Sequence, residues 1–298
     1  MTQSGRLLLL IIACISIFPV LSKAPADPVV MTVGPDKVRY SEFNYFRDRN
    51  RLVREFDPGL ATDAEMYVSY RLKILDALSQ RLDTVSYFSA ELDRYAASLA
   101  DSVSAGALDA GECAQLMREY REGILLYELS KKKLWTPVSD DQVLEDFFEP
   151  RRDNYAWSEI RFKGYLVMAT NDSLAEEVVH WLSVTRIVPR GAELSQELRK
   201  MFGPDVRVET VLAPRGANAI VDYIAFGGPE PAPTGRWKSY AAARGRMIDR
   251  PETMSDVRAR VANDFQLETE TRWIDSLRRC YPVKINHKLL RRLSGQQK

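Results

Sequence analysis

Apolar residues recur at helical spacing through the middle of the chain. Between about 116 and 129 they fall three or four positions apart, which is typical of a helix with one buried face. Three lysines at 131–133 follow, and Pro137 comes soon after them. Because proline lacks a backbone N–H, the pattern predicts that this helix ends before Pro137.

The segments on either side of this helix alternate between strand and helix patterns. Before it, the sequence predicts a hairpin at 29–33 and 38–40, then helices beginning at Ser41, at Thr62 and near Phe88. After it, the sequence predicts a short helix capped by Asp140, a strand at 160–169, helices at 173–185 and 192–201, and strands at 206–212 and 219–226. A capping box at Thr253 and Asp256 begins a long helix at 254–277, and a strand at 281–285 is expected to join the opening hairpin.

These elements predict an α+β protein in which a small α/β unit interrupts a mainly helical core. The core comprises residues 27–157 and 249–290, in which the C-terminal long helix and strand complete the N-terminal hairpin and helices. The α/β unit is expected at 158–230. Because 227–233 are rich in glycine and proline, residues 231–248 are expected to be a linker.

The first 24 residues have the pattern of a secretory signal peptide. An apolar run from 7 to 21 is short for a membrane span, contains Pro19 and is followed by small residues suited to cleavage. We therefore expect the chain to be exported. The alternative is a lipoprotein anchored through Cys14, and only in that case would the chain be held at a membrane.

Charge and composition exclude several classes of function. The net charge is +1 and basic residues are interleaved with acidic ones, so a nucleic-acid partner is not expected. The two histidines, His180 and His287, have no nucleophile motif or ligand spacing beside them. We expect no metal, no cofactor, no small-molecule substrate and no catalytic residues, and whether the chain is an enzyme stays open, with a non-enzyme favoured.

Several segments resemble SurA-type periplasmic chaperones and parvulin (PpiC-type) peptidyl-prolyl isomerases. They are YREGILLYELSKKKLW, DDQVLEDFF, RRDNYAW, RFKGYLVMA, the N-terminal TVGPDKVRYSEF and the C-terminal stretch from RPETMSDVR to YPVKIN. The resemblance implies a SurA-like chaperone core, with a degenerate parvulin-like domain at 158–230. Lys163-Gly164-Tyr165 stand where the family would place a histidine, and the family's glycine-rich segment is missing.

The resemblance implies a periplasmic, ATP-independent holdase for unfolded outer-membrane or secreted proteins. The alternatives are a divergent prolyl isomerase and a non-catalytic subunit of an active isomerase paralogue. Candidate client-binding residues are Phe147, Phe148, Tyr155 and Trp157, because such a chaperone needs an apolar, aromatic groove.

Two cysteines follow the predicted signal peptide. The family pattern would bring Cys113 near Cys280, and an oxidising compartment would allow a disulfide between them. The alternative, which we favour, is two buried small apolar side chains.

Overall fold

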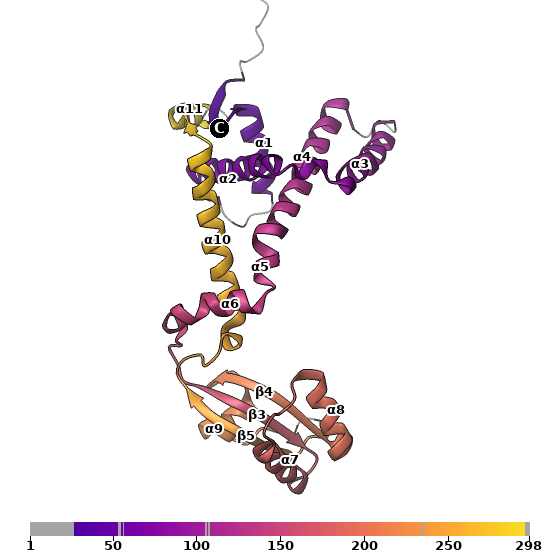
Figure 1. The fold of residues 1–298 in the computed structure, drawn as a ribbon, viewed down its shortest axis with the longest axis vertical. Coiled ribbons are helices and arrows are strands. Elements are labelled where there is room, and N and C mark those ends of the chain that lie inside the picture. The colour runs from indigo at the N-terminus through magenta and orange to yellow at the C-terminus, as the bar shows by residue number, and fades with distance from the viewer. Residues whose placement is uncertain are drawn as a thin grey trace, which may run out of the picture. The chain divides into compact units, whose positions relative to one another are not determined.

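The computed structural model describes residues 27–52, 55, 57–104, 106, 108–233 and 235–295, and these form helices and two three-stranded antiparallel sheets (Figure 1). The α+β class expected from the sequence is confirmed. The predicted signal peptide at 1–24, with Cys14, lies outside the described residues. None of the described helices combines the length and the hydrophobicity that a membrane span requires.

Internal contacts divide the chain into two compact units. The first comprises Met1–Met117 and Ile274–Lys298, and the second is the continuous stretch Arg118–Trp273. This division differs from the expected one, because residues of the predicted core at 27–157 belong to both units.

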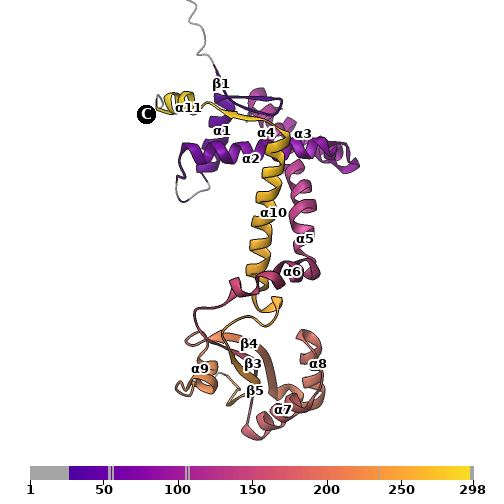
Figure 2. The same cartoon turned by 60° about the vertical axis from the view of Figure 1, so that its left-hand side comes forward.

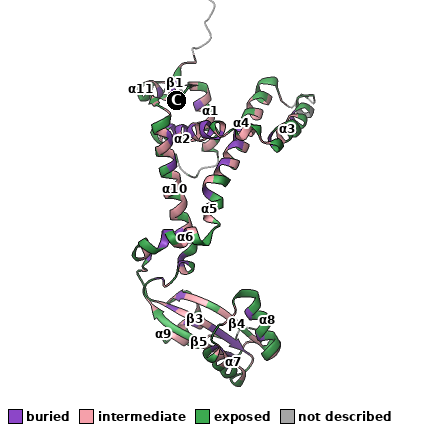
Figure 3. Ribbon diagram, in the orientation of Figure 1, coloured by how far each residue is buried: buried purple, intermediate pink, exposed green. Residues whose placement is uncertain are grey.

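The first unit consists of a small sheet and several helices. Its elements are β1 (Val29–Val33), β2 (Asp36–Arg39), α1 (Tyr40–Arg51), α2 (Leu60–Ser79), the 3₁₀ turn Leu82–Thr84, α3 (Ser86–Ser104), the start of α4 (Ala110–Ser130), the end of α10 (Arg258–Cys280), β6 (Val283–Ile285) and α11 (His287–Gly295). Arg47 joins α1 to α2 through the buried carboxylate of Asp63, with 2.9 Å between Nε and Oδ2. Figure 3 shows that burial in this unit is densest along α2.

The sheet of the first unit joins distant parts of the sequence. Its order is β2-β1-β6, so β1 lies in the middle, and Met31 pairs with Ile285. The expected addition of the C-terminal strand to the opening hairpin is confirmed. Gly34 has φ of 55° in the hairpin turn, and a Cβ there would lie 2.9 Å from the ring of Tyr281. Glycine therefore permits both the turn and the close approach of the C-terminal segment.

The second unit contains the rest of α4 and the larger sheet. Its further elements are a π-helical turn (Lys131–Trp135), α5 (Thr136–Val138), α6 (Asp141–Phe148), the 3₁₀ segment Glu149–Tyr155, β3 (Arg161–Ala169), α7 (Asp172–Val184), α8 (Gly191–Phe202), the 3₁₀ turn Gly203–Asp205, β4 (Val206–Pro214), α9 (Ala219–Phe226), β5 (Ser239–Ile248), the 3₁₀ turn Met254–Val257 and most of α10. Pro137 does not end the helix as expected, because the π turn carries the helical path into α5, where proline occupies the first turn.

Helices cover both faces of the larger sheet, whose order is β4-β3-β5. Val167 and Ala169 of β3 face α7 and α8, whereas Phe162 faces α9 (Figure 2). Two sequence predictions are corrected here. Residues 219–226 form the helix α9, whose N–H groups are capped by Asn218, and the expected linker at 231–248 contains β5, which pairs with β3.

Two glycines let β3 and β5 approach each other beside Phe162. A Cβ at Gly245 would lie 2.4 Å from the Phe162 ring, and one at Gly164 would lie 2.8 Å from the Cα of Gly245. The register of the two strands shifts between Lys163 and Tyr165, which marks an irregularity opposite these glycines.

We expect Gly245→Ala to lower the free energy of unfolding by about 1–3 kcal/mol, because the new methyl group overpacks against Phe162. Urea unfolding measures this change. Gly123→Ala in α4 is the matched control, because nothing lies within 4 Å of its Cβ, and it should stabilise the helix by about 0.5–1 kcal/mol. If the clash with the Phe162 ring is the cause, Gly245→Ala should lower the free energy of unfolding less in a Phe162→Leu background than in the wild type. Strictly additive effects of the two substitutions would contradict this explanation.

Candidate functional site

Three of the four candidate client-binding residues are buried. Phe147, Phe148 and Tyr155 are 8%, 0% and 2% exposed, and they pack against Met254, Val257 and Val261. The ring of Phe147 also meets that of Phe265 edge to face, at 5.4 Å between centroids. These side chains hold α6 and the following 3₁₀ segment against α10, so the structure corrects the expectation that they line a client groove.

The fourth candidate, Trp157, is half-buried at the edge of the same cluster. The guanidinium of Arg161 lies over its ring at 4.8 Å, and its backbone N–H donates to the carbonyl of Asp249. Nearby, burial and then the carboxylate of Asp264 raise the pKa of Tyr155 above its usual value of 10. The whole group serves to pack this part of the second unit.

Lys163 of β3 is held in an ion-pair cluster. Its ammonium lies 2.6 Å from Oδ2 of Asp256 and 2.9 Å from Oε2 of Glu252, and Arg246 of β5 also donates to Glu252. Hydrogen bonds from Arg246 and Lys163 lower the pKa of Glu252 from 4.5 to about 2. The cluster joins the sheet to the beginning of α10, and a cationic side chain so engaged is a poor general base.

An exposed pair of aromatic side chains lies on the helical path through the π turn. Tyr127 is 53% exposed and Trp135 is 44% exposed, and their rings meet at 5.3 Å between centroids. A π turn accommodates one additional residue. Trp135 therefore lies where residue 134 would lie in an uninterrupted α-helix. That position is seven residues after Tyr127, so the two side chains are on the same face of the helix. The sequence prediction missed this pair, because it assigned 116–129 to a helix with one buried face and did not include the π turn at Lys131–Trp135.

A second apolar surface surrounds a pocket of about 690 Å³ beside the sheet, which we call the apolar pocket. Its apolar lining consists of Ile160, Ala225, Phe226 and Met247, with Glu159 and Arg215 at its margin. Ile160 is 56% exposed and Met247 is 45% exposed. Arg215 lies over the Phe226 ring and donates to the Phe226 carbonyl oxygen at 2.8 Å. The pocket can therefore receive an apolar group from another molecule without rearranging a buried core.

The remaining sequence candidates form no reactive group. His180 on α7 and His287 at the start of α11 are exposed, and among the described residues no three metal-binding side chains come together. Cys113 is half-buried and Cys280 is exposed, and both are free thiols in the structure. Cys280 is thus not the buried apolar residue that was favoured for it.

Comparisons with known proteins add one loose likeness. No known family model and no curated protein matches the sequence. One solved structure that the chain resembles comes from work on PEB4 and Cj1289, two structurally related SurA-like chaperones of Campylobacter jejuni. The match covers 86% of this chain and 98% of that chain, at 12% identity and a TM-score of 0.29. A TM-score this low does not show that the two chains share a fold.

We expect the stability of the second unit to fall as the pH drops from about 4.5 toward 2. Glu252 is still ionised there in the folded chain, with its pKa near 2, whereas the unfolded chain takes up a proton near pH 4.5. The stabilisation is fully present above pH 4.5 and is lost as the pH approaches 2. Urea unfolding at several pH values measures it.

Glu252→Gln should lower stability at pH 6 and flatten the pH dependence between 4.5 and 2. Glu176→Gln on α7 is the control, because its side chain is exposed and makes no ion pair among the described residues. An unchanged slope in Glu252→Gln would show that the ion-pair cluster does not contribute to folding.

Proposed function

We propose that this chain is an exported, ATP-independent chaperone that holds unfolded polypeptides, with outer-membrane or secreted proteins as clients. The observation that supports it most is the apolar pocket, where Ile160 and Met247 remain exposed around an apolar cavity of about 690 Å³. The segments that resemble SurA-type chaperones support the same function.

Client binding would rest on burial of apolar surface. Unfolded clients expose aromatic and aliphatic side chains, which gain about 25 cal/mol for each Å² of apolar surface removed from water. The apolar pocket receives one such side chain, and the Tyr127–Trp135 pair offers a second, flat surface for another. Two separate weak contacts on one client suit a protein that must bind many sequences and release them.

A divergent prolyl isomerase is the second candidate, and the apolar pocket is again the feature that favours it. An apolar cavity can hold a proline ring while the peptide bond twists, and this lowers a barrier of about 20 kcal/mol. The engagement of Lys163 with Asp256 and Glu252 weighs against it, because no free acid or base then lies at that position of β3. A non-catalytic subunit of an isomerase paralogue is the remaining alternative, and purification of the native complex tests it.

We expect the chain to suppress the aggregation of an outer-membrane β-barrel protein diluted from urea, as measured by light scattering at near-equal concentrations. No suppression at several-fold excess would contradict the chaperone function. A proline-limited refolding assay on the same protein then tests the isomerase, whose activity should disappear on Met247→Asp if the apolar pocket is its site.

We expect the double substitution Tyr127→Ala and Trp135→Ala to weaken client binding about 30-fold, because exposed aromatic contacts are worth about 1 kcal/mol each. The concentration needed for half-suppression of scattering measures the loss. Ile187→Ala is the control, because Ile187 is 81% exposed and belongs to neither apolar surface. Equal losses in both variants would mean that general surface hydrophobicity, and not the aromatic pair, holds the client.

A further inference from the structure

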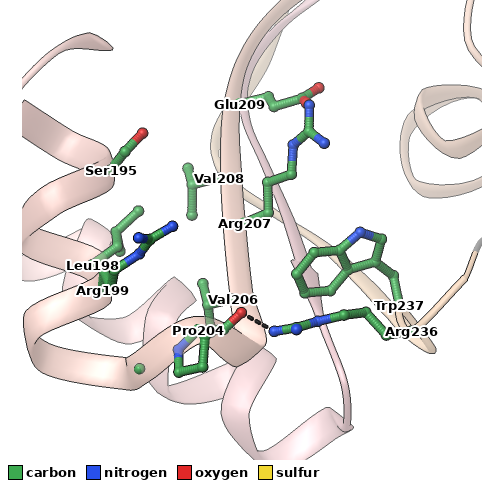
Figure 4. A pocket seen from close by; sticks show the side chains of 11 residues that line it. Ser195, Leu198, Arg199, Pro204, Val206, Arg207, Val208, Glu209, Arg236 and Trp237 are labelled. Carbon is green, nitrogen blue, oxygen red and sulfur yellow. Dashed lines mark hydrogen bonds and ion pairs between the residues drawn. The ribbon is translucent and has the colours of Figure 1, made fainter. Parts of the chain in front are cut away.

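A second cavity, at one end of the larger sheet, contains three arginines, and we call it the arginine pocket. It has a volume of about 530 Å³ and is formed by α8, the start of β4 and the segment before β5 (Figure 4). These three segments contribute Arg199, Arg207 and Arg236, respectively. The pocket shares no lining residue with the apolar pocket.

The charges of the arginine pocket are incompletely balanced. Arg207 pairs with Glu209 at 2.5 Å, and Arg236 pairs with Asp205 at 2.8 Å. The side chain of Arg199 has no hydrogen-bond or ion-pair partner within the described part of the chain. Three guanidinium groups thus face two carboxylates, both partly open to water at 38% and 53% exposure. An incoming carboxylate on the α8 side of β4 would therefore find the guanidinium of Arg199 without a competing carboxylate.

The apolar lining shows how a ligand would lie. Val206 and Val208 project toward Leu198 of α8, whereas Arg207 and Trp237 lie on the other side of β4 (Figure 4). The half-buried ring of Trp237 stacks beneath the guanidinium of Arg236 at 4.9 Å. The pocket lining therefore includes residues from both faces of β4.

β4 forms an edge of its sheet. It is the terminal strand in the order β4-β3-β5, in which its neighbour is β3. An open strand edge can add an extended polypeptide, whose alternate side chains then enter pockets on either face. β4 continues from the pocket to Pro214, so such a segment can run on past the cavity.

We propose that the arginine pocket binds an acidic side chain of an extended polypeptide segment that pairs with the outer edge of β4. This inference rests on the proposed chaperone function, because it names one chemical class of client segment. The carboxylate of an aspartate or glutamate meets Arg199, and apolar neighbours of that residue contact Trp237 and Val208. Acidic extended segments are thereby favoured over neutral ones of the same length and hydrophobicity.

Fluorescence anisotropy on the full chain tests the proposal with two labelled peptides, both amidated at the C-terminus. One contains a central glutamate in a run of alternating apolar residues, and the other has glutamine at that position. We expect the glutamate peptide to bind about fivefold more tightly, with a preference that shrinks as salt rises. Equal affinities, or no binding of either peptide, would overturn the proposal.

Arg199→Gln should remove the preference and leave the affinity for the glutamine peptide unchanged. Arg190→Gln is the matched control, because it makes the same charge change at the other end of α8, outside the pocket. Equal effects of both variants would mean that general charge, and not the pocket, selects the acidic peptide. Tighter binding of the peptide with a free C-terminal carboxylate and a central glutamine would assign the pocket to a chain end instead.

Backbone pairing is tested with peptides N-methylated at successive positions. Methylation should abolish binding at every second position, because only alternate N–H groups of an added strand face β4. Tolerance at all positions would overturn the edge pairing. Peptide affinity is measured independently of aggregation. If the chain suppresses scattering but binds both peptides equally, the proposed chaperone function stands and only this inference is overturned.

Discussion

The carboxylate of Asp256 is the constraint on which the second unit depends. Its Oδ2 accepts hydrogen bonds from the backbone N–H groups of Glu252 and Thr253, and it also lies 2.6 Å from the ammonium of Lys163. This buried oxygen therefore caps the 3₁₀ turn that leads into α10, and its ion pair with Lys163 connects that turn to the central strand of the sheet. Because a buried charge is costly unless it is both paired and hydrogen-bonded, each contact makes the others necessary.

Lys163 has a structural role in the second unit. Its ammonium connects β3 to the 3₁₀ turn before α10 through Asp256. Gly164 and Gly245, which lie beside it, permit the close packing of β3 and β5. This part of the sheet is committed to holding the unit together. The surfaces for which we propose binding, namely the apolar pocket, the aromatic pair and the arginine pocket, involve other residues.

Local signals in the sequence were enough to predict elements whose ends are fixed by capping. The box at Thr253 and Asp256, the cap at Asp140 and the strand at 281–285 were all recovered. Residues 219–226 were misread because their apolar run suits a strand equally well, although Asn218 and Gly227 mark the two ends of a helix. β5 was missed because alanines and arginines are weak strand formers, and only its pairing with β3 makes it a strand.

The candidate site was harder to predict, because exposure is a tertiary property. Phe147 and Tyr155 share their aromatic character with Tyr127 and Trp135, and spacing along the chain does not say which pair meets a partner. The long helix α10 covers the first pair. The second pair depends on a π turn, which leaves no signature in composition.

The discontinuity of the first unit has a consequence for the order of folding during synthesis. Residues 118–273 emerge as one uninterrupted piece, so the second unit can complete its core as soon as they are available. β1, by contrast, must wait for β6, which is made some 250 residues later. Until then the hairpin has an unpaired edge that other strands can occupy. The chain therefore passes through a stage at which it needs the same protection from aggregation that we propose it gives to its clients.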